Sequence, residues 1–301
     1  MLSVFFGSLI LSMNRYLSSR AAIFTATLLA LGCRSVSIFG QSPTPLTVDN
    51  VVARLQANLD SYQKSIPNFL AEEHMESSES STAVQITRRG PSLSSNRETI
   101  AESTFRLKRK VDLASNTFMF EESRDFTTID GHPAKGRSIS TPVMLVGAFS
   151  GGLAFVSEVE RECMTYTLEP PKPGKPIIVH YQSAPHIAHP EICILPEETA
   201  GRVWIDPASM QIERIEVDVP RHLLTPIRGD GRTDAPTMTH WHVEVVFKPV
   251  VLNARTFWLP ATIASVCSND NQEWSFHGSY RNYRLLEVHS RVVVPGDTSI
   301  Q

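Results

Sequence analysis

Two histidines and a glutamate in the segment THWHVEV have the chemistry to bind a metal ion. His240, His242 and Glu244 alternate with apolar residues, beginning with Trp241 and Val243. Alternate residues of a β-strand project from the same face of a sheet, so the two imidazoles and the carboxylate are expected to lie together. Such a set can bind a divalent metal, as in a metal-dependent hydrolase. The same alternation is typical of a strand whose polar face meets solvent, which is the simpler interpretation.

Other reactive residues lie in poorer contexts for catalysis. His180, His186 and His189 fall in a proline-bearing segment without an obvious carboxylate partner. Ser150, in GAFSGG, lacks the first glycine of the G-x-S-x-G nucleophile motif because Ala148 takes that place. The chain also has no phosphate-binding loop, dinucleotide fingerprint or H-E-x-x-H motif. We therefore expect no enzymatic activity and no cofactor.

The beginning of the chain predicts export. Residues 1–40 combine arginines with two short apolar runs, which is typical of a secretory signal peptide that starts at Met1 or at Met13. Cys33, in LALGC, offers a less favoured alternative in which a lipid anchors the mature chain. We expect a periplasmic protein or one associated with the outer membrane, with no transmembrane helix in the mature chain.

Three cysteines lie beyond the predicted signal peptide. In an oxidising compartment a disulfide is expected, and Cys163 and Cys193 are the nearest pair in the sequence. The phase of TIASVCS places Cys267 at an apolar strand position, so we expect it to be a buried free thiol.

The composition is that of a folded protein with no affinity for nucleic acid. Of 301 residues, 42% are hydrophobic and 20% charged, and the net charge is −3. The one basic run, RLKRK, is expected to be the solvated face of a strand. The length after residue 40 suits a single β-rich domain over residues 41–301.

One helix and about ten strands are predicted in that domain. After a linker at 41–47, apolar residues recur at three- and four-residue steps over 48–66, which predicts an amphipathic helix with Thr47 or Asp49 as its cap. Residues 75–97 are polar and rich in serine, so a mobile loop or a weak edge strand is expected. Short strands, EICILP among them, follow up to about residue 290. Their spacing predicts an antiparallel sandwich or an open barrel.

An apolar segment with three glycines, residues 138–159, has neither a helical period nor strict alternation. It is either a buried helix followed by a loop or a mobile flap over a hydrophobic cavity, with glycines as hinges. In the second case its larger apolar side chains would contact a ligand; these are Val143, Leu145, Val146, Phe149, Leu153 and Phe155.

The hairpin GRVWIDPASMQIERIEVDVP contains a break in its alternation. Ile212 is in phase with one set of apolar residues and Ile215 with the other, so a β-bulge near Glu213 and Arg214 is predicted. Asp206 precedes a proline and suits the first position of a type I turn.

This hairpin, together with FWLPATI and YRNYRLLEV, resembles the strands of bacterial outer-membrane lipoprotein-sorting proteins (LolA-like) and the related periplasmic sensor RseB. The resemblance implies an α+β fold that is mostly antiparallel β: a strongly curved sheet or unclosed barrel. Its concave side would be plugged by the helix and the apolar flap around a cavity for acyl chains. The proline-rich segments at 169–176 and 221–236 depart from that family.

Three functions are consistent with these features. The first is an exported, non-enzymatic protein that holds a lipid, an acyl chain or an apolar peptide in the cavity of the curved sheet. The second is a hydrolase that uses the metal-binding face of His240, His242 and Glu244. The third is a structural module of the cell envelope that binds a protein partner through an exposed sheet edge.

Overall fold

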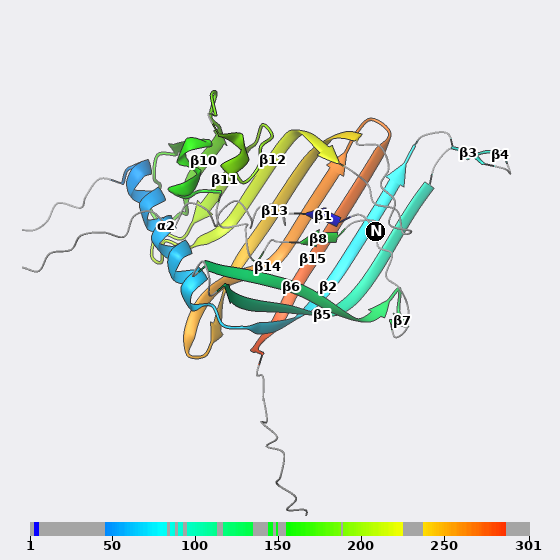
Figure 1. Ribbon diagram of the computed structural model, residues 1–301, viewed down its shortest axis with the longest axis horizontal. Coiled ribbons are helices and arrows are strands. Elements are labelled where there is room, and N and C mark those ends of the chain that lie inside the picture. Colours follow the sequence, from blue (N-terminus) through cyan, green and yellow to red (C-terminus); the bar gives the residue numbers. More distant parts are fainter. Residues whose placement is uncertain are drawn as a thin grey trace, which may run out of the picture.

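The computed structural model describes residues 3–5, 46–82, 85–87, 90–92, 95–112, 117–134, 144–146, 149, 155–187, 189–224 and 237–286. Most of the predicted signal peptide, including Cys33, and most of the apolar segment 138–159 lie outside these residues. Where residues are described, one large antiparallel sheet and one α-helix dominate (Figure 1). None of the described helices is long and apolar enough to cross a membrane.

The large sheet contains eleven strands, each antiparallel to its neighbours. From one end to the other, the strands are β7 (His132–Pro133), β6 (Thr117–Ile129), β5 (Ser95–Asp112), β2 (Phe69–Ser81), β15 (Gln272–Leu285), β14 (Arg255–Ser268), β13 (Thr237–Leu252), β12 (Ile212–Leu224), β11 (Ala200–Ile205), β10 (Ile177–Ser183) and β9 (Met164–Leu168). Two small pairs stand apart: β1 (Ser3–Phe5) with β8 (Met144–Val146), and β3 (Gln85–Thr87) with β4 (Gly90–Ser92).

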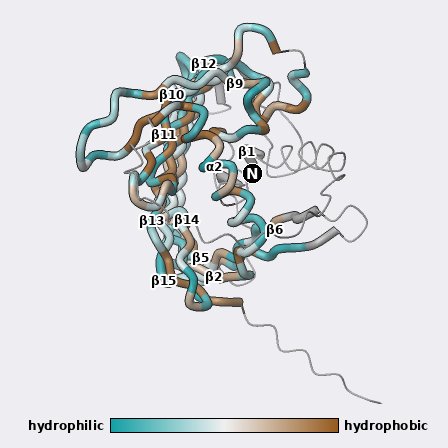
Figure 2. The backbone as a smooth tube through the Cα atoms, turned by 90° about the vertical axis from the view of Figure 1, so that its left-hand side faces the viewer, coloured by the Kyte–Doolittle hydropathy of each residue, from teal (hydrophilic) through white to brown (hydrophobic). Residues whose placement is uncertain are grey.

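The sheet is curved and not closed. Its end strands, β7 and β9, do not pair with each other among the described residues. Seen from the side, the sheet bends around α2, and β1 lies on the same side (Figure 2). Register shifts interrupt several pairings, including those of β11 with β12 and of β13 with β14. Because each extra residue bends its strand, these shifts contribute to the curvature. The predicted class, a mostly antiparallel unclosed sheet with one amphipathic helix, is confirmed.

The predicted bulge lies in the hairpin of β11 and β12. Trp204 pairs with Arg214 and Ile205 pairs with Ile212, so Glu213 is the extra residue. Ile212 and Ile215 are both buried as a result, although residues three positions apart lie on opposite faces of a regular strand.

Asp206 forms the turn of this hairpin. Its Oδ2 accepts hydrogen bonds from the backbone N–H and the hydroxyl of Ser209, at 2.7 and 2.5 Å. These bonds, first from the hydroxyl and then from the backbone, lower the pKa of Asp206. The structural role predicted for this aspartate is confirmed.

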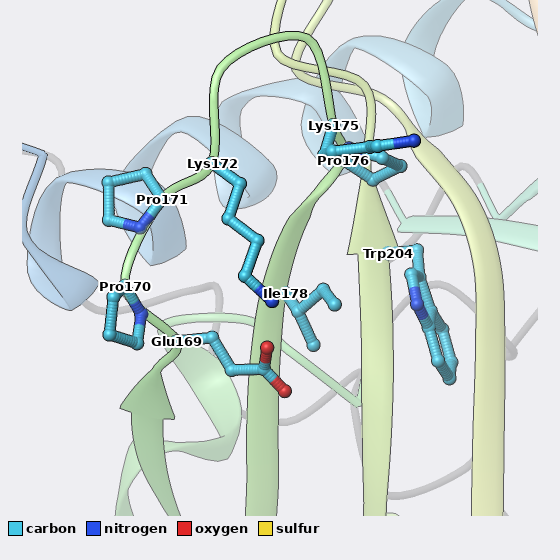
Figure 3. A pocket seen from close by; sticks show the side chains of 8 residues that line it. All are labelled: Glu169, Pro170, Pro171, Lys172, Lys175, Pro176, Ile178 and Trp204. Atoms are coloured by element: carbon cyan, nitrogen blue, oxygen red, sulfur yellow. The ribbon is translucent and has the colours of Figure 1, made fainter.

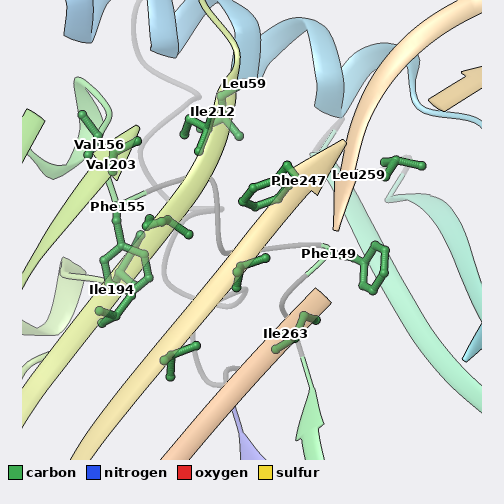
Figure 4. Close-up of a cluster of buried hydrophobic side chains, with 14 of the residues drawn as sticks. Leu59, Phe149, Phe155, Val156, Ile194, Val203, Ile212, Phe247, Leu259 and Ile263 are labelled. Atoms are coloured by element: carbon green, nitrogen blue, oxygen red, sulfur yellow. The ribbon is translucent and has the colours of Figure 1, made fainter. Parts of the chain in front are cut away.

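The helix α2 (Val48–Ser65) covers one face of the sheet, which we call the concave face. Thr47 is its N-cap, and its side chain accepts a hydrogen bond from Asn50 N–H at 3.3 Å. The predicted apolar stripe is buried, and its buried residues are Val51, Val52, Leu55 and Leu59. In Figure 4, Leu59 lies beside Ile212 of β12.

The prediction of a mobile loop or a weak edge strand over residues 75–97 was wrong for the part that belongs to the large sheet. Strand β2 continues to Ser81 and pairs with β5 from Met75 opposite Ala101 to Ser81 opposite Ser95. It also pairs with β15, so it is an inner strand. Met75, Ser77 and Ser81 are buried. The sequence concealed this strand because serines occupy inward-facing positions where apolar residues would have marked a strand.

EICILP was wrongly expected to be a strand. Pro190–Ile192 forms a short 3-10 helix, and the chain then continues without regular structure through Cys193 to Leu195. Ile194 and Leu195 are nevertheless buried, so burial in a loop accounts for the apolar run. The second 3-10 helix, Val159–Glu162, leads directly to Cys163.

Candidate functional site

An aromatic cluster lines the concave face, and Phe149 is at its centre. The ring of Phe149 stacks on Phe105 of β5, with 4.3 Å between centroids, and meets Tyr280 of β15 edge-on at 4.9 Å. Phe69 of β2 lies 5.9 Å away. Offset and edge-on arrangements of this kind are the favourable ones for aromatic rings. The side chain of Phe149, from the predicted flap, therefore packs against the aromatic rings of the concave face.

Two hydrogen bonds attach the backbone of Phe149 to neighbouring elements. The hydroxyl of Tyr62, on α2, donates to its carbonyl oxygen at 3.1 Å. Its N–H donates to Oε1 of Glu122, on β6, at 3.2 Å. Burial, and then the negative charge of Glu122, raises the pKa of Tyr62, so its hydroxyl keeps its proton and can donate. Phe149 thus links the helix to the sheet.

Phe155 fills a second place on the concave face. Its ring stacks on Tyr181 of β10 with 5.8 Å between centroids, and its carbonyl accepts a hydrogen bond from the hydroxyl of Tyr166 at 3.1 Å. Figure 4 places it beside Ile194. The predicted disulfide between Cys163 and Cys193 is present and joins the two loops that carry these apolar residues.

A buried charged network crosses four strands beside the aromatic cluster. Glu73 of β2 is completely buried and accepts hydrogen bonds from Arg124 Nε at 2.9 and 2.8 Å, from Tyr280 at 2.7 Å and from Ser103 at 2.6 Å. The guanidinium of Arg124 also lies 5.3 Å from the centre of the Phe105 ring. Burial opposes the charge of Arg124, but Glu73, together with Tyr280 and Glu122, more than offsets this effect and raises the pKa of the arginine.

This network was missed from the sequence. FLAEEHM reads as charged and exposed, yet Glu73 lies two residues after Ala71 and two before Met75, both of which are buried. Strand alternation was therefore the available signal. Arg124 and Tyr280 come from distant parts of the sequence, and only the register of the strands brings them to Glu73.

Glu160 is a second buried carboxyl group, next to the disulfide. Only 1% of the residue is exposed, and burial raises its pKa to about 7. Oε2 accepts a hydrogen bond from Ile194 N–H at 3.2 Å. Among the described residues, neither its Oε1 nor the nearby buried hydroxyl of Ser157 has a hydrogen-bond partner.

The predicted ligand-contacting residues are placed only in part. Phe149 and Phe155 are buried in the two clusters above. Leu145 and Val146 belong to β8, where the backbone alone is described, and Val143 and Leu153 lie outside the described residues. A hollow beneath α2, lined by Leu59, Tyr62 and Ile212 among others, holds about 20 Å³. That volume is enough for about one water molecule. An acyl chain would need more space than this hollow provides.

The predicted metal-binding face is partly exposed and engaged in ion pairs. His240 Nε2 lies 2.7 Å from Asp218 Oδ1, and His242 Nδ1 lies 3.5 Å from the same atom. Glu244 instead accepts from Arg214 at 2.9 Å. No set of three or more metal-ligating side chains was found among the residues that the structure describes.

His180, His189 and Cys267 also make contacts of a structural kind. His180 contacts Glu169 at 2.7 Å, and His189 contacts Glu191 at 3.2 Å. Cys267 is a buried free thiol, as predicted, and lies 3.0 Å from the hydroxyl of Thr239. Burial raises the pKa of Cys267, which keeps it in the unreactive thiol form.

The opposite, convex face of the sheet has two hollows, one on each side of Trp204. The first holds about 250 Å³ and is lined by prolines and lysines of the β9–β10 connection (Figure 3). The second holds about 390 Å³ and reaches Trp258 on β14. The sequence did not reveal them, because the lining residues come from five strands and a connecting segment.

Comparisons with known proteins leave the chain without an assigned family. No protein-family model matches it, and no curated protein matches it either. Among solved structures, it is similar to a Vibrio parahaemolyticus domain assigned to the outer membrane lipoprotein-sorting proteins. The identity is 11% and the TM-score 0.32, over 79% of this chain and 93% of that domain. Likeness at this level assigns neither fold nor function, so both rest on the residues themselves.

Proposed function

We propose that this protein is an exported, non-enzymatic binding protein that holds an apolar ligand, such as a lipid, an acyl chain or an apolar peptide, against the concave face of its sheet. The observation that supports this proposal is the position of Phe149. Its ring occupies an aromatic site on the sheet that would suit an apolar group from outside equally well.

In this proposal the ligand replaces Phe149. The hollow beneath α2 is too small for an acyl chain, so room for one comes from withdrawal of the aromatic ring. The ligand would regain the apolar contacts that the ring gives up, and the glycines at 147, 151 and 152 would allow the segment to move. Val143, Leu145, Val146, Leu153 and Phe155 are proposed as further contacts of the bound ligand.

The disulfide and the sequence of residues 1–40 support export. A disulfide persists in oxidising compartments such as the periplasm, and it is rare in the cytosol. The predicted signal peptide agrees with that location. Lipid anchoring at Cys33 stays the less favoured alternative.

Substitution of Phe149 tests the proposal. Phe149→Ala removes the competing ring, so we expect the variant to bind a fatty acid with an environment-sensitive fluorophore about tenfold more tightly than the unmodified protein. Phe257→Ala is the matched control, because Phe257 is a buried ring that contacts Arg255 and is not one of the rings found around Phe149. Thermal unfolding of both variants confirms that they are folded.

Two results would contradict the proposal that the protein holds an apolar ligand. One is that neither the unmodified protein nor Phe149→Ala binds the fluorescent fatty acid. The other is that Phe257→Ala gains as much affinity as Phe149→Ala, since the gain would then reflect a loosened core. Lipid extraction from protein purified in its native compartment provides an independent measurement of what it carries.

A further inference from the structure

Trp204 forms a rigid ridge on the convex face. Two guanidinium groups lie over its indole ring. Arg202 is 5.0 Å and Arg214 is 4.6 Å from the ring centre. Both arginines are held by Glu216, which accepts from Arg202 through Oε2 and from Arg214 through Oε1. Glu244 provides Arg214 with a second carboxylate. Because the charged groups are paired with one another, the indole is fixed before any partner arrives.

The strand register places Trp204 within a row of four residues that cross the sheet. Ile178 lies opposite Trp204, Trp204 opposite Arg214, and Arg214 opposite Val246. The row therefore runs across β10, β11, β12 and β13. The two hollows flank the ridge, with Ile178 in one and Val246 in the other. Two hollows separated by a ridge suit a linear partner that places one side chain in each.

Unpaired lysines surround the hollows. Lys172 and Lys175 line the first hollow and Lys248 the second. In the described part of the chain, none of the three makes an ion pair with a carboxylate, whereas Glu169, in the first hollow, is paired with His180. The chain as a whole has a net charge of −3, so the charge of this lysine-bearing region is opposite in sign to the net charge of the chain. A partner that carries carboxylates would neutralise the lysines and be attracted over a distance.

The chemistry of the walls distinguishes between anionic partners. The two linings consist of tryptophan, proline, aliphatic, phenylalanine and charged residues, and contain no serine, threonine, asparagine, glutamine or aspartate. A glycan, rich in hydroxyl groups, would find hydrogen-bonding side chains only among the charged residues, of which Glu169 and Arg214 are already paired. Aromatic residues and arginine are instead the residues that dominate the binding energy of protein–protein contacts.

We propose that the groove formed by the two hollows and Trp204 binds an acidic, extended peptide segment of another protein. Apolar side chains of the segment enter the hollows, and its carboxylates contact Lys172, Lys175 and Lys248. This surface lies on the opposite face of the sheet from the proposed apolar ligand, so the two sites can be tested separately.

Fluorescence anisotropy with labelled synthetic peptides tests this proposal. We expect an alternating glutamate–leucine peptide to bind the full chain, with an affinity that falls as salt is added, and the lysine–leucine counterpart not to bind. Trp204→Ala should weaken binding about tenfold or more, as expected for a central aromatic anchor. Lys172→Glu combined with Lys248→Glu should do the same through charge reversal.

Control variants separate this groove from general charge effects. Lys64→Glu combined with Lys108→Glu makes the same change of charge on α2 and β5 and should leave peptide binding unchanged. Phe149→Ala should leave it unchanged too. The proposal is overturned if the glutamate–leucine peptide does not bind, or if the groove variants bind it as well as the unmodified protein. Binding of anionic vesicles or acidic polysaccharides alone would also overturn it.

Discussion

The two faces of the sheet are made by alternate residues of the same strands, and they differ in what they contain. On β13, Trp241 and Val243 are buried on the concave side, whereas His240 is exposed and His242 is partly exposed on the convex side. The concave face is filled by the chain itself, through α2, Phe149 and Phe155. The convex face is open at Trp204, where two hollows lie among charged side chains.

The same interaction has a different consequence on each face. The Glu73–Arg124 pair is buried, with side chains 0% and 6% exposed, while the His240–Asp218 pair is about half exposed. Loss of a partner inside the protein leaves a charge without solvation, which costs several kcal/mol. Loss of a partner at the surface leaves a charge that water solvates. Position in the sheet, more than residue type, therefore decides what a charged group contributes.

The largest effect is expected from breaking the buried pair. Glu73→Ala removes the carboxylate from Arg124, Tyr280 and Ser103, and should lower the free energy of unfolding by about 3–5 kcal/mol. Urea unfolding monitored by circular dichroism measures this loss. His240→Ala is the matched change on the convex face and should cost less than about 1 kcal/mol.

A double substitution sharpens this test. Glu73→Leu with Arg124→Met replaces the buried charges by apolar groups and should recover part of the stability that Glu73→Ala loses, because the hydroxyls of Tyr280 and Ser103 still lack their acceptor. Equal losses for Glu73→Ala and His240→Ala would show that the contrast between the two faces is wrong.

A smaller, pH-dependent effect is expected at Glu160. Its pKa is raised from 4.5 to about 7, so the folded protein retains this proton at pH values where the unfolded chain has released it. The contribution is therefore fully present below pH 4.5 and is lost as the pH rises through 7, a loss of about 3 kcal/mol. Thermal unfolding between these pH values measures it. Glu160→Gln should remove this dependence, and Glu158→Gln, at an exposed neighbour, should retain it.

The smallest of these effects is expected from added volume at Gly201. A Cβ atom there would lie 2.0 Å from the carbonyl oxygen of Glu216 and 2.4 Å from the ring of Tyr181, whose hydroxyl donates to that carbonyl. Gly201→Ala should therefore cost about 1–3 kcal/mol in a denaturant titration. Gly278→Ala, whose nearest contacts are 3.0 and 3.2 Å away in side chains, should cost less. An unchanged stability of Gly201→Ala would mean that the backbone of β11 can move away from β12.

The sequence by itself determined several local features, because each depends on residues close together in the chain. The period of apolar residues determined α2, the phase break at Glu213 determined the bulge, and Asp206 determined a turn. The spacing of Cys163 and Cys193 was enough to predict their disulfide. The serine-rich strand β2 was missed because its inward-facing positions do not look apolar.

The tertiary structure alone decided how distant segments meet. Glu73, Arg124 and Tyr280 form one network only because the register of four strands places them together. Trp204 gains its two arginines and its hollows from the curvature and register of the sheet on its convex side. Phe149 stacks on Phe105 of a distant strand, a contact that no local sequence pattern predicts. Local propensities specify elements, but the packing free energy of the whole sheet selects which of their side chains come into contact.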